Sequence, residues 1–272
     1  MSLKLLFLSP RQPLPARSGA RLREYHFLRA LARSNDVTYG YFIDPGAAAL
    51  TSKDLPFCRE IVAIPKPSAY TGGKTIQGIF GPWPRPVLNY SSPAMSAAVE
   101  RLVERERFDL VHLDSIHMVR YALAARTKQA SLKAIYNWHN IESEAMRRYG
   151  ATTSSPARRL YAGFTAGKLE RLESRILHSE FGHIVCSARE RQQLLDIAPK
   201  ARVAVVDNGV DVDYFGQGVE AAATTTAQRI VFVGTMDYFP NSDAAIFFAN
   251  QIWPHARAVL PGVEFTIVGA NP

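Results

Sequence analysis

The sequence has too few cysteines to build a stapled fold or a metal cage. Its 272 residues contain two, Cys58 and Cys186, which cannot make a disulfide framework or a structural zinc site. A reducing, cytoplasmic setting is therefore the default expectation. No run of about 18 apolar residues occurs, which argues against a membrane-spanning helix. The N-terminal segment MSLKLLFLSP is too short and too strand-like for a signal peptide.

Two families of nucleotide and nucleic-acid motifs are also missing. The loop SPRQPLPARSGARLRE, residues 9–24, has no G-x-G-x-x-G pattern, which disfavours an NAD-dependent oxidoreductase. No zinc finger or aromatic-plus-basic RNA motif accompanies the net charge of +8, so no nucleic-acid partner is expected. The excess of positive charge suits anionic lipid head groups or phosphorylated ligands instead.

The sequence does contain a regular alternation of apolar, strand-like runs and helical segments. Strands are expected at residues 4–9, 37–43, 60–64, 110–114, 133–138, 183–186 and 203–206. Helices are expected at residues 19–33, 93–107, 116–128, 141–148, 156–180 and 188–197. This alternation predicts an α/β, Rossmann-like domain with a parallel sheet and helices on both faces. The Pro- and Gly-rich segment 65–90 is interpreted as a long excursion from the pattern.

A domain boundary is expected near VAVVDNGVDVDYF, residues 203–215. The apolar run predicts a buried strand, and Asn208-Gly209 favours a turn because both residues tolerate positive φ. We expect an N-terminal Rossmann-like domain over residues 1–207. Residues 208–272 would hold the hinge and the start of a second Rossmann-like domain, with an Ala/Thr-rich linker at 216–228.

Candidate sites lie where expected strands end, because ligands bind at the carboxyl edge of a parallel sheet. In residues 9–24, a helix beginning at Gly19 would offer free N–H groups to an anion, next to Arg17, Arg21 and Arg23. The alternative is a solvated basic loop. In residues 134–144, the strand delivers His139 to the edge, and a purely structural histidine is the alternative.

A third strand-to-helix junction lies at residues 230–241. Gly234 would let a backbone approach a ligand closely. Asn241 or Ser242 would cap the next helix. Taken alone, this junction is a generic feature of α/β folds.

Three other patterns suggest chemistry but have simpler explanations. The segment TGGKT, 71–75, lacks the first glycine and the leading strand of a phosphate loop. Asp211 and Asp213 form a D-x-D pattern, although aspartates are ordinary turn and cap residues. A metal site is also conceivable from the remaining candidates, but no further ligands support it; they are His112, Asp114 and His117.

Five segments, taken in order, resemble family-4-type retaining glycosyltransferases. They are LSPRQPLPARSGARLREYHFLRALA, FDLVHLDSIHM, NWHNIESE, VVDNGVDVDYF and FVGTMDYFPNSDA. The set is most similar to bacterial sugar transferases of exopolysaccharide and exosortase systems. The resemblance implies two facing Rossmann-like domains. The first would hold the acceptor, and the second would hold a nucleotide-sugar donor of the UDP or GDP type.

The same resemblance implies roles for single residues. Gly19 matches the glycine of the first loop, which approaches the donor phosphates, and Arg23 matches a basic residue of the following helix. His139 matches the histidine that contacts the donor sugar near the reacting carbon, so it is the expected catalytic residue. No metal and no other cofactor are implied.

Gly234 matches the glycine that opens the donor loop of the second domain. Many relatives follow it with an Arg and a Lys, whereas here Thr235 and Met236 follow and Asn241 lies near the Lys position. Gly234, Thr235 and Asn241 are the expected donor-binding residues. The family's paired glutamates have no counterpart before Pro272. The expectation is therefore a transferase lacking its C-terminal part, inactive or weakly active alone.

For an intact enzyme, the resemblance implies transfer to a glycan or polyprenyl-linked acceptor in surface polysaccharide synthesis. The setting would be the cytoplasm, at the inner face of a bacterial membrane. The helix expected at 156–179 places basic residues beside Leu160, Phe164, Leu172 and Ile176, which suits peripheral membrane contact, although a core-packed helix is the simpler interpretation. A non-catalytic module that binds a phosphorylated or lipid-linked sugar remains the alternative function.

Overall fold

A computed structural model describes residues 2–16, 18–68, 71–216 and 228–270. The chain separates into two compact units, Met1–Gly209 and Val210–Pro272. Most of the expected linker, together with Arg17, lies outside the described residues.

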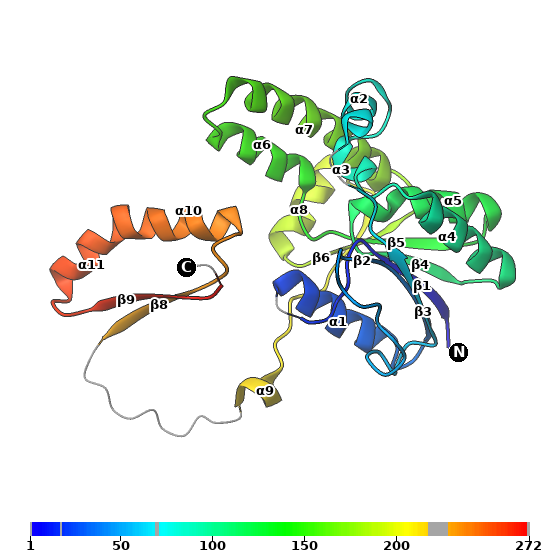
Figure 1. Ribbon diagram of the computed structural model, residues 1–272, viewed down its shortest axis with the longest axis horizontal. Helices are drawn as coiled ribbons and strands as arrows, with labels where there is room; N and C mark the ends of the chain where they lie inside the picture. Colours follow the sequence, from blue (N-terminus) through cyan, green and yellow to red (C-terminus); the bar gives the residue numbers. More distant parts are fainter. Residues whose placement is uncertain (1, 17, 69–70, 217–227, 271–272) are drawn as a thin grey trace. The chain divides into compact units, whose positions relative to one another are not determined.

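The described part of the first unit is built on a parallel sheet of seven strands in the order β3-β2-β1-β4-β5-β6-β7 (Figure 1). The strands are β1 (Lys4–Ser9), β2 (Asp36–Ile43), β3 (Glu60–Pro65), β4 (Leu110–Leu113), β5 (Lys133–Asn137), β6 (Gly182–Val185) and β7 (Arg202–Val205). All seven strands were expected, to within one or two residues at their ends. The chain starts at the centre of the sheet and then builds outward on each side of β1 in turn, so the strand order reverses at β1 and β4. Ligands of α/β proteins bind at such reversals.

Helices connect the strands and cover both faces of this sheet, which confirms the expected α/β, Rossmann-like fold. The helices are α1 (Gly19–Leu31), α2 (Gly72–Phe80), α3 (Arg85–Leu88), α4 (Pro93–Arg105), η1 (Ile116–Met118), α5 (Val119–Lys128), α6 (Glu142–Thr152), α7 (Pro156–Leu177) and α8 (Ala188–Ile197). The segment 65–90 is not a plain excursion, because it contains α2 and α3. Thr71 caps α2 by accepting from the Lys74 N–H.

Strand β1 shows why the sequence folds into three layers. Its alternate residues enter two separate hydrophobic clusters, because successive side chains of a strand point to opposite faces. Leu5 and Phe7 pack with α1 and β2, whereas Leu6 and Leu8 pack with α4, α5 and the end of α7. Residues 4–9 are therefore apolar almost throughout, as expected for a strand covered on both faces.

The expected turn at Asn208-Gly209 is not formed. Residues 206–210 have no regular structure. Among the described glycines, positive φ is found at Gly46, Gly262 and Gly269 but not at Gly209. The Asn208 side chain is instead held by Arg23, which is described with the site below.

The second unit is small. Within its described part, β8 (Arg229–Val233) and β9 (Glu264–Val268) form a two-stranded parallel sheet. The connection between them contains α10 (Phe239–Phe247), the π-helical turn η2 (Phe248–Ile252) and α11 (Trp253–Val259); the short helix α9 (Val212–Gly216) precedes β8. The rings of Phe248, Trp253 and Phe265 pack together between helix and sheet. In the part of the chain that the structure describes, no helix is both long and apolar enough to cross a membrane.

Candidate functional site

The candidate site lies where β1, β4 and β5 end, at neighbouring positions along one edge of the sheet. Each strand delivers a polar side chain there that is fully buried: Ser9, Asp114 and Asn137. Because burying polar groups is costly unless they are hydrogen-bonded, three such residues at the ligand-binding edge of an α/β sheet indicate a built site.

His139 is fixed by Asp114. The ring Nε2 lies 2.8 Å from Asp114 Oδ2, and Asn137 Nδ2 donates to Asp114 Oδ1 over 2.9 Å. Burial raises the pKa of the Asp114 carboxyl, but the charge and hydrogen bond of His139, together with the charges of Arg11 and His112, lower it, and the net pKa is below its ordinary value. An ionised Asp114 places the proton on Nε2. Nδ1 has no hydrogen-bond partner in the described part of the chain.

Arg23 links helix α1 to this pair. Its Nη2 donates to Asn137 Oδ1 over 3.4 Å and its Nη1 donates to Asn208 Oδ1 over 2.8 Å. The half-buried guanidinium forms no salt bridge with a carboxylate in the described residues, and its buried Nε has no hydrogen-bond partner there. Its positive charge is therefore available to an anion, since amide oxygens satisfy its donors without neutralising it.

A second buried carboxyl lies on α1 beside this network. Glu24 is fully buried, and the Tyr39 hydroxyl lies 2.5 Å from Glu24 Oε1. Burial raises the pKa of Glu24 well above its ordinary value, and repulsion by Asp114 adds to this, although Arg11 at 3.9 Å acts in the opposite direction. The environment thus favours a neutral Glu24 next to an ionised Asp114, which concentrates the negative charge on the carboxylate that orients His139.

The arginines that the structure describes in the predicted site at residues 9–24 do not form one cluster. Helix α1 does begin at Gly19, after the cap residue Ser18, whose side chain accepts from the Arg21 N–H over 3.5 Å. The Arg21 side chain turns away to Asp44, with Nη2 at 2.7 Å from Oδ2. Of the arginines expected to form one cluster, Arg23 therefore reaches the network with His139, whereas Arg21 does not.

In the second unit, Gly234, Thr235 and Asn241 lie together after β8. Asn241 Nδ2 donates to the Thr235 carbonyl over 3.0 Å, and a Cβ atom on Gly234 would come within 2.7 Å of that Nδ2. The expected capping is wrong, because α10 begins earlier and its N-cap is Tyr238, with no side-chain cap. Asn241 lies inside the helix and braces the loop. Asn241 is inside the helix because the first turn accommodates Pro240. The helix therefore starts before Pro240 and not after it.

The three patterns with simpler explanations, namely TGGKT, the D-x-D pattern and the possible metal ligands, occupy ordinary structural positions. TGGKT starts α2, β3 ends well before it at Pro65, and its Lys74 Nζ donates to the Ser68 carbonyl over 2.6 Å. Asp213 lies in the first turn of α9. His112 stacks on Phe7 with ring centres 4.3 Å apart, and His117 stacks on Tyr90. No group of three or more His, Cys, Asp or Glu side chains among the described residues could hold a metal ion.

Sequence reasoning missed several members of the network. The sequence pattern indicates Asp114 only as a possible metal ligand, although its position at a strand end next to that of His139 also indicates a shared site. Asn137 carries the same signal. Glu24 has none, because a glutamate inside an amphipathic helix is expected on its solvated face. Asn208 was interpreted as a turn residue.

One protein-family model matches about half of the chain. Residues 69–209 match the glycosyl transferase 4-like domain, a segment that contains His139, Asp114 and Asn208 but not Arg23 or the second unit. A comparison with curated protein sequences gives no match.

Solved structures resemble this chain at low sequence identity. The structure of Phytolacca americana UGT2 complexed with UDP-2fluoro-glucose and pterostilbene is 10% identical, with a TM-score of 0.51, over 98% of this chain and 72% of that one. Arabidopsis thaliana UGT89C1 complexed with UDP is 14% identical with a TM-score of 0.44, over 86% of this chain. UDP-GlcNAc 2-epimerase from Methanocaldococcus jannaschii is 12% identical with a TM-score of 0.44, over 98% of this chain and 66% of that one.

The chain spans 58% of the length of the Arabidopsis protein. At 10% identity, the Phytolacca americana structure shows a common α/β fold and nothing about chemistry. The family match rests on different ground, since it covers more than half of the residues and includes the edge that carries His139 and Asp114. The chain belongs to the glycosyl transferase 4-like domain family.

Proposed function

We propose that this chain is part of a retaining glycosyltransferase that transfers a sugar from a nucleotide-sugar donor, of the UDP or GDP type, to a glycan or lipid-linked acceptor. Surface polysaccharide synthesis is the proposed setting, in the cytoplasm and at the inner face of the membrane. The first unit would hold mainly the acceptor. The second unit would hold mainly the donor, through Gly234, Thr235 and Asn241.

The observation that carries this proposal is the charge arrangement around Arg23 and His139. Arg23 is a half-buried cation with amide partners and no carboxylate partner in the described residues. A diphosphate leaving group develops negative charge as the sugar departs, and a fixed cation in a partly dry site stabilises that charge more than it stabilises the ground state. The N-terminus of α1, at Gly19, would stabilise the same negative charge.

His139 has a role distinct from that of a general base. Its Nε2 is committed to Asp114 at 2.8 Å, so the ring is held in one orientation and presents Nδ1. From there it would position the donor sugar near the reacting carbon. Asp114 acts through His139 and is therefore a positioning residue.

The first experiment separates donor binding from turnover. UDP and GDP are titrated against the chain and its Arg23→Ala variant by calorimetry, with Arg101→Ala on α4 as the matched control. Loss of a charge-assisted contact costs about 1.5–3 kcal/mol, so Arg23→Ala should weaken binding by roughly tenfold or more. Equal affinities for both proteins would remove Arg23 from the donor site.

The second experiment measures release of nucleotide from UDP- and GDP-sugars in the presence of a polyprenyl-linked acceptor. We expect slow turnover by this chain alone. His139→Ala should reduce turnover by about 10²-fold or more, as removal of one preorganised active-site contact does, with unchanged nucleotide affinity. His178→Ala, at the exposed end of α7, is the control. Tight binding of a sugar ligand with no product from any donor would favour the non-catalytic binding module.

A further inference from the structure

Helix α2 turns its apolar side outward. Ile76, Ile79 and Phe80 lie at positions i, i+3 and i+4, which share one helix face, and their side chains are 61%, 37% and 84% exposed. The opposite side packs on α3, since a Cβ atom on Gly78 would lie 2.9 Å from Arg85 Cβ. Such a face normally packs against a core, but the described chain leaves it uncovered.

Helix α7 adds to this uncovered area. Leu160 and Phe164, one turn apart, are 78% and 46% exposed. The sequence suggests one apolar stripe that also includes Leu172 and Ile176, but these two are buried in the core of the first unit. The stripe is therefore divided: its C-terminal half holds α7 to the sheet, and its N-terminal half stays free.

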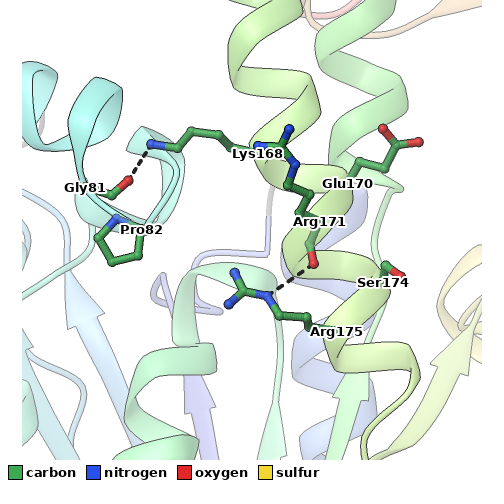
Figure 2. Close-up of a pocket in the computed structure, with 7 residues that line it drawn as sticks. All are labelled: Gly81, Pro82, Lys168, Glu170, Arg171, Ser174 and Arg175. Carbon is green, nitrogen blue, oxygen red and sulfur yellow. Dashed lines mark hydrogen bonds between the residues drawn. The ribbon is translucent and has the colours of Figure 1, made fainter.

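Lys168 fixes the two helices side by side. Its Nζ donates to three carbonyl oxygens at the end of α2, those of Gly78 at 2.6 Å, Ile79 at 3.1 Å and Gly81 at 2.6 Å. It also lies 5.3 Å from the centre of the Phe164 ring. Figure 2 shows Lys168 reaching from α7 to Gly81. We call the resulting area the α2–α7 surface, defined by Ile76, Ile79, Phe80, Leu160 and Phe164.

The surroundings of the α2–α7 surface are cationic. No acidic residue occurs in the sequence between Glu60 and Glu100, which includes α2, or between Glu144 and Glu170, which includes the exposed half of α7. Arg158 and Arg159 flank Leu160 and are exposed. The apolar side chains are thus bordered by positive charge.

The cationic border continues along α7. A hollow of about 730 Å³ beside Lys168 is lined by Arg171 and Arg175 as well as Glu170 (Figure 2). Glu170 is paired with Arg147 at 2.5 Å. Arg171 and Arg175 form no ion pair with a carboxylate in the described residues, so both remain able to meet phosphate groups.

We propose that the α2–α7 surface docks on an anionic lipid bilayer, with Phe80 and Leu160 entering the boundary between head groups and acyl chains and the arginines on lipid phosphates. Apolar side chains bordered by cations that have no carboxylate partner in the described residues are the pattern of interfacial membrane helices. A second copy of this chain fits poorly, because a symmetric contact would bring the same cations together. The inference rests on the proposed function in one respect, because the lipid-linked acceptor would be embedded in the bilayer on which the α2–α7 surface docks.

The test is co-sedimentation of the full chain with phosphatidylcholine vesicles that contain or lack phosphatidylglycerol. We expect binding to the anionic vesicles that weakens with salt. Phe80→Ser with Leu160→Ser should reduce the partition coefficient by about a hundredfold, because each large apolar side chain contributes about a tenfold effect when buried. Arg158→Gln with Arg159→Gln should reduce it by about thirtyfold on anionic vesicles only, because each basic residue contributes about a fivefold effect near an anionic surface. Leu123→Ser, which removes an apolar residue of α5 that is 41% exposed, should have no effect.

Each outcome decides the matter. No binding to anionic vesicles, equal binding to neutral ones, or the same loss from Leu123→Ser as from the surface variants would overturn the proposal. Nucleotide affinity is measured on the same variants and should not change. Loss of nucleotide binding by Arg23→Ala and vesicle binding by the α2–α7 surface are thus separate readouts, so either proposal can fail without the other.

Discussion

Replacing His112 by Phe should remove an acid-induced loss of stability. The His112 side chain is 1% exposed and lies between Phe7, at 4.3 Å, and Phe27, at 5.1 Å between ring centres. Its Nε2 has no hydrogen-bond partner in the described part of the chain. Burial lowers the pKa of His112 from 6.5 to about 4, with Asp114 opposing the shift and His139 and Arg23 adding to it.

Proton linkage gives the sign and the size of this loss of folding stability. Well above pH 6.5, the ordinary pKa of the group, His112 is neutral in both the folded and the unfolded state and contributes nothing to the pH dependence. As the pH falls from 6.5 to about 4, the unfolded chain binds a proton that the folded chain does not, so stability is lost. The slope is about 1.4 kcal/mol per pH unit, which gives about 2 kcal/mol at pH 5 and approaches about 3.4 kcal/mol at the lower limit.

Urea unfolding between pH 8 and pH 5 measures this loss, followed by tryptophan fluorescence because Trp138 is buried in the first unit. His112→Phe should lose about 2 kcal/mol less than the native chain over that range. His112→Gln is the matched control: it packs worse, but it should flatten the profile equally, because a packing cost does not depend on pH. Glu24 acts in the opposite direction, since its raised pKa makes acid favourable to folding, and its effect cancels in the comparison. Parallel pH profiles for the three proteins would refute the argument.

Three further predictions concern the site and the second unit. Asp114→Asn keeps the shape of the side chain but removes its charge, so turnover should fall as it does for His139→Ala while nucleotide affinity, measured by calorimetry, stays the same. Gly234→Ala should displace the Asn241 amide and break its bond to Thr235, at a cost of about 1 kcal/mol, seen as faster amide exchange at the start of α10; Gly216→Ala, where a Cβ atom meets nothing, should leave that exchange unchanged. Amides of β8 should exchange much faster than those of β1, because a two-stranded sheet is marginally stable; comparable protection of both strands would contradict this.

The sequence predicts the sheet well because each of its strands is a local signal. A strand covered on both faces is a short apolar run between polar loops, and residues 4–9 and 110–113 show this without any knowledge of the rest of the chain. Helix α2 gave no such signal. Its apolar residues sit in a segment rich in Pro and Gly, and a Lys from α7, far along the chain, caps its last carbonyls.

His139 and Arg23 were predicted separately, but the reason they belong together was not. Their connection runs through Asn137 and Asp114, which lie on two adjacent strands. Adjacency of β4 and β5 follows from topology, and side-chain hydrogen bonds follow from burial. Strand adjacency and side-chain hydrogen bonds both depend on segments that are far apart in the sequence. Local patterns therefore predict the individual residues but not the network that connects them.

The division of charge between the two buried carboxyls follows from how many partners each has. Asp114 has both oxygens bonded, to His139 and to Asn137, whereas Glu24 accepts from Tyr39 on one oxygen, and the other oxygen, 3.9 Å from Arg11, has no hydrogen-bond partner in the described residues. Two negative charges buried close together repel strongly, so the better-satisfied carboxyl keeps its charge. A neutral Glu24 can donate to the Tyr39 hydroxyl, which in turn can donate to the Arg11 carbonyl at 3.1 Å. Helix α1 thus brings a neutral acid and a cation, Glu24 and Arg23, to the same edge. In this network Asp114 carries the negative charge and Arg23 carries the positive charge, and Arg23 has amide partners but no carboxylate partner in the described residues.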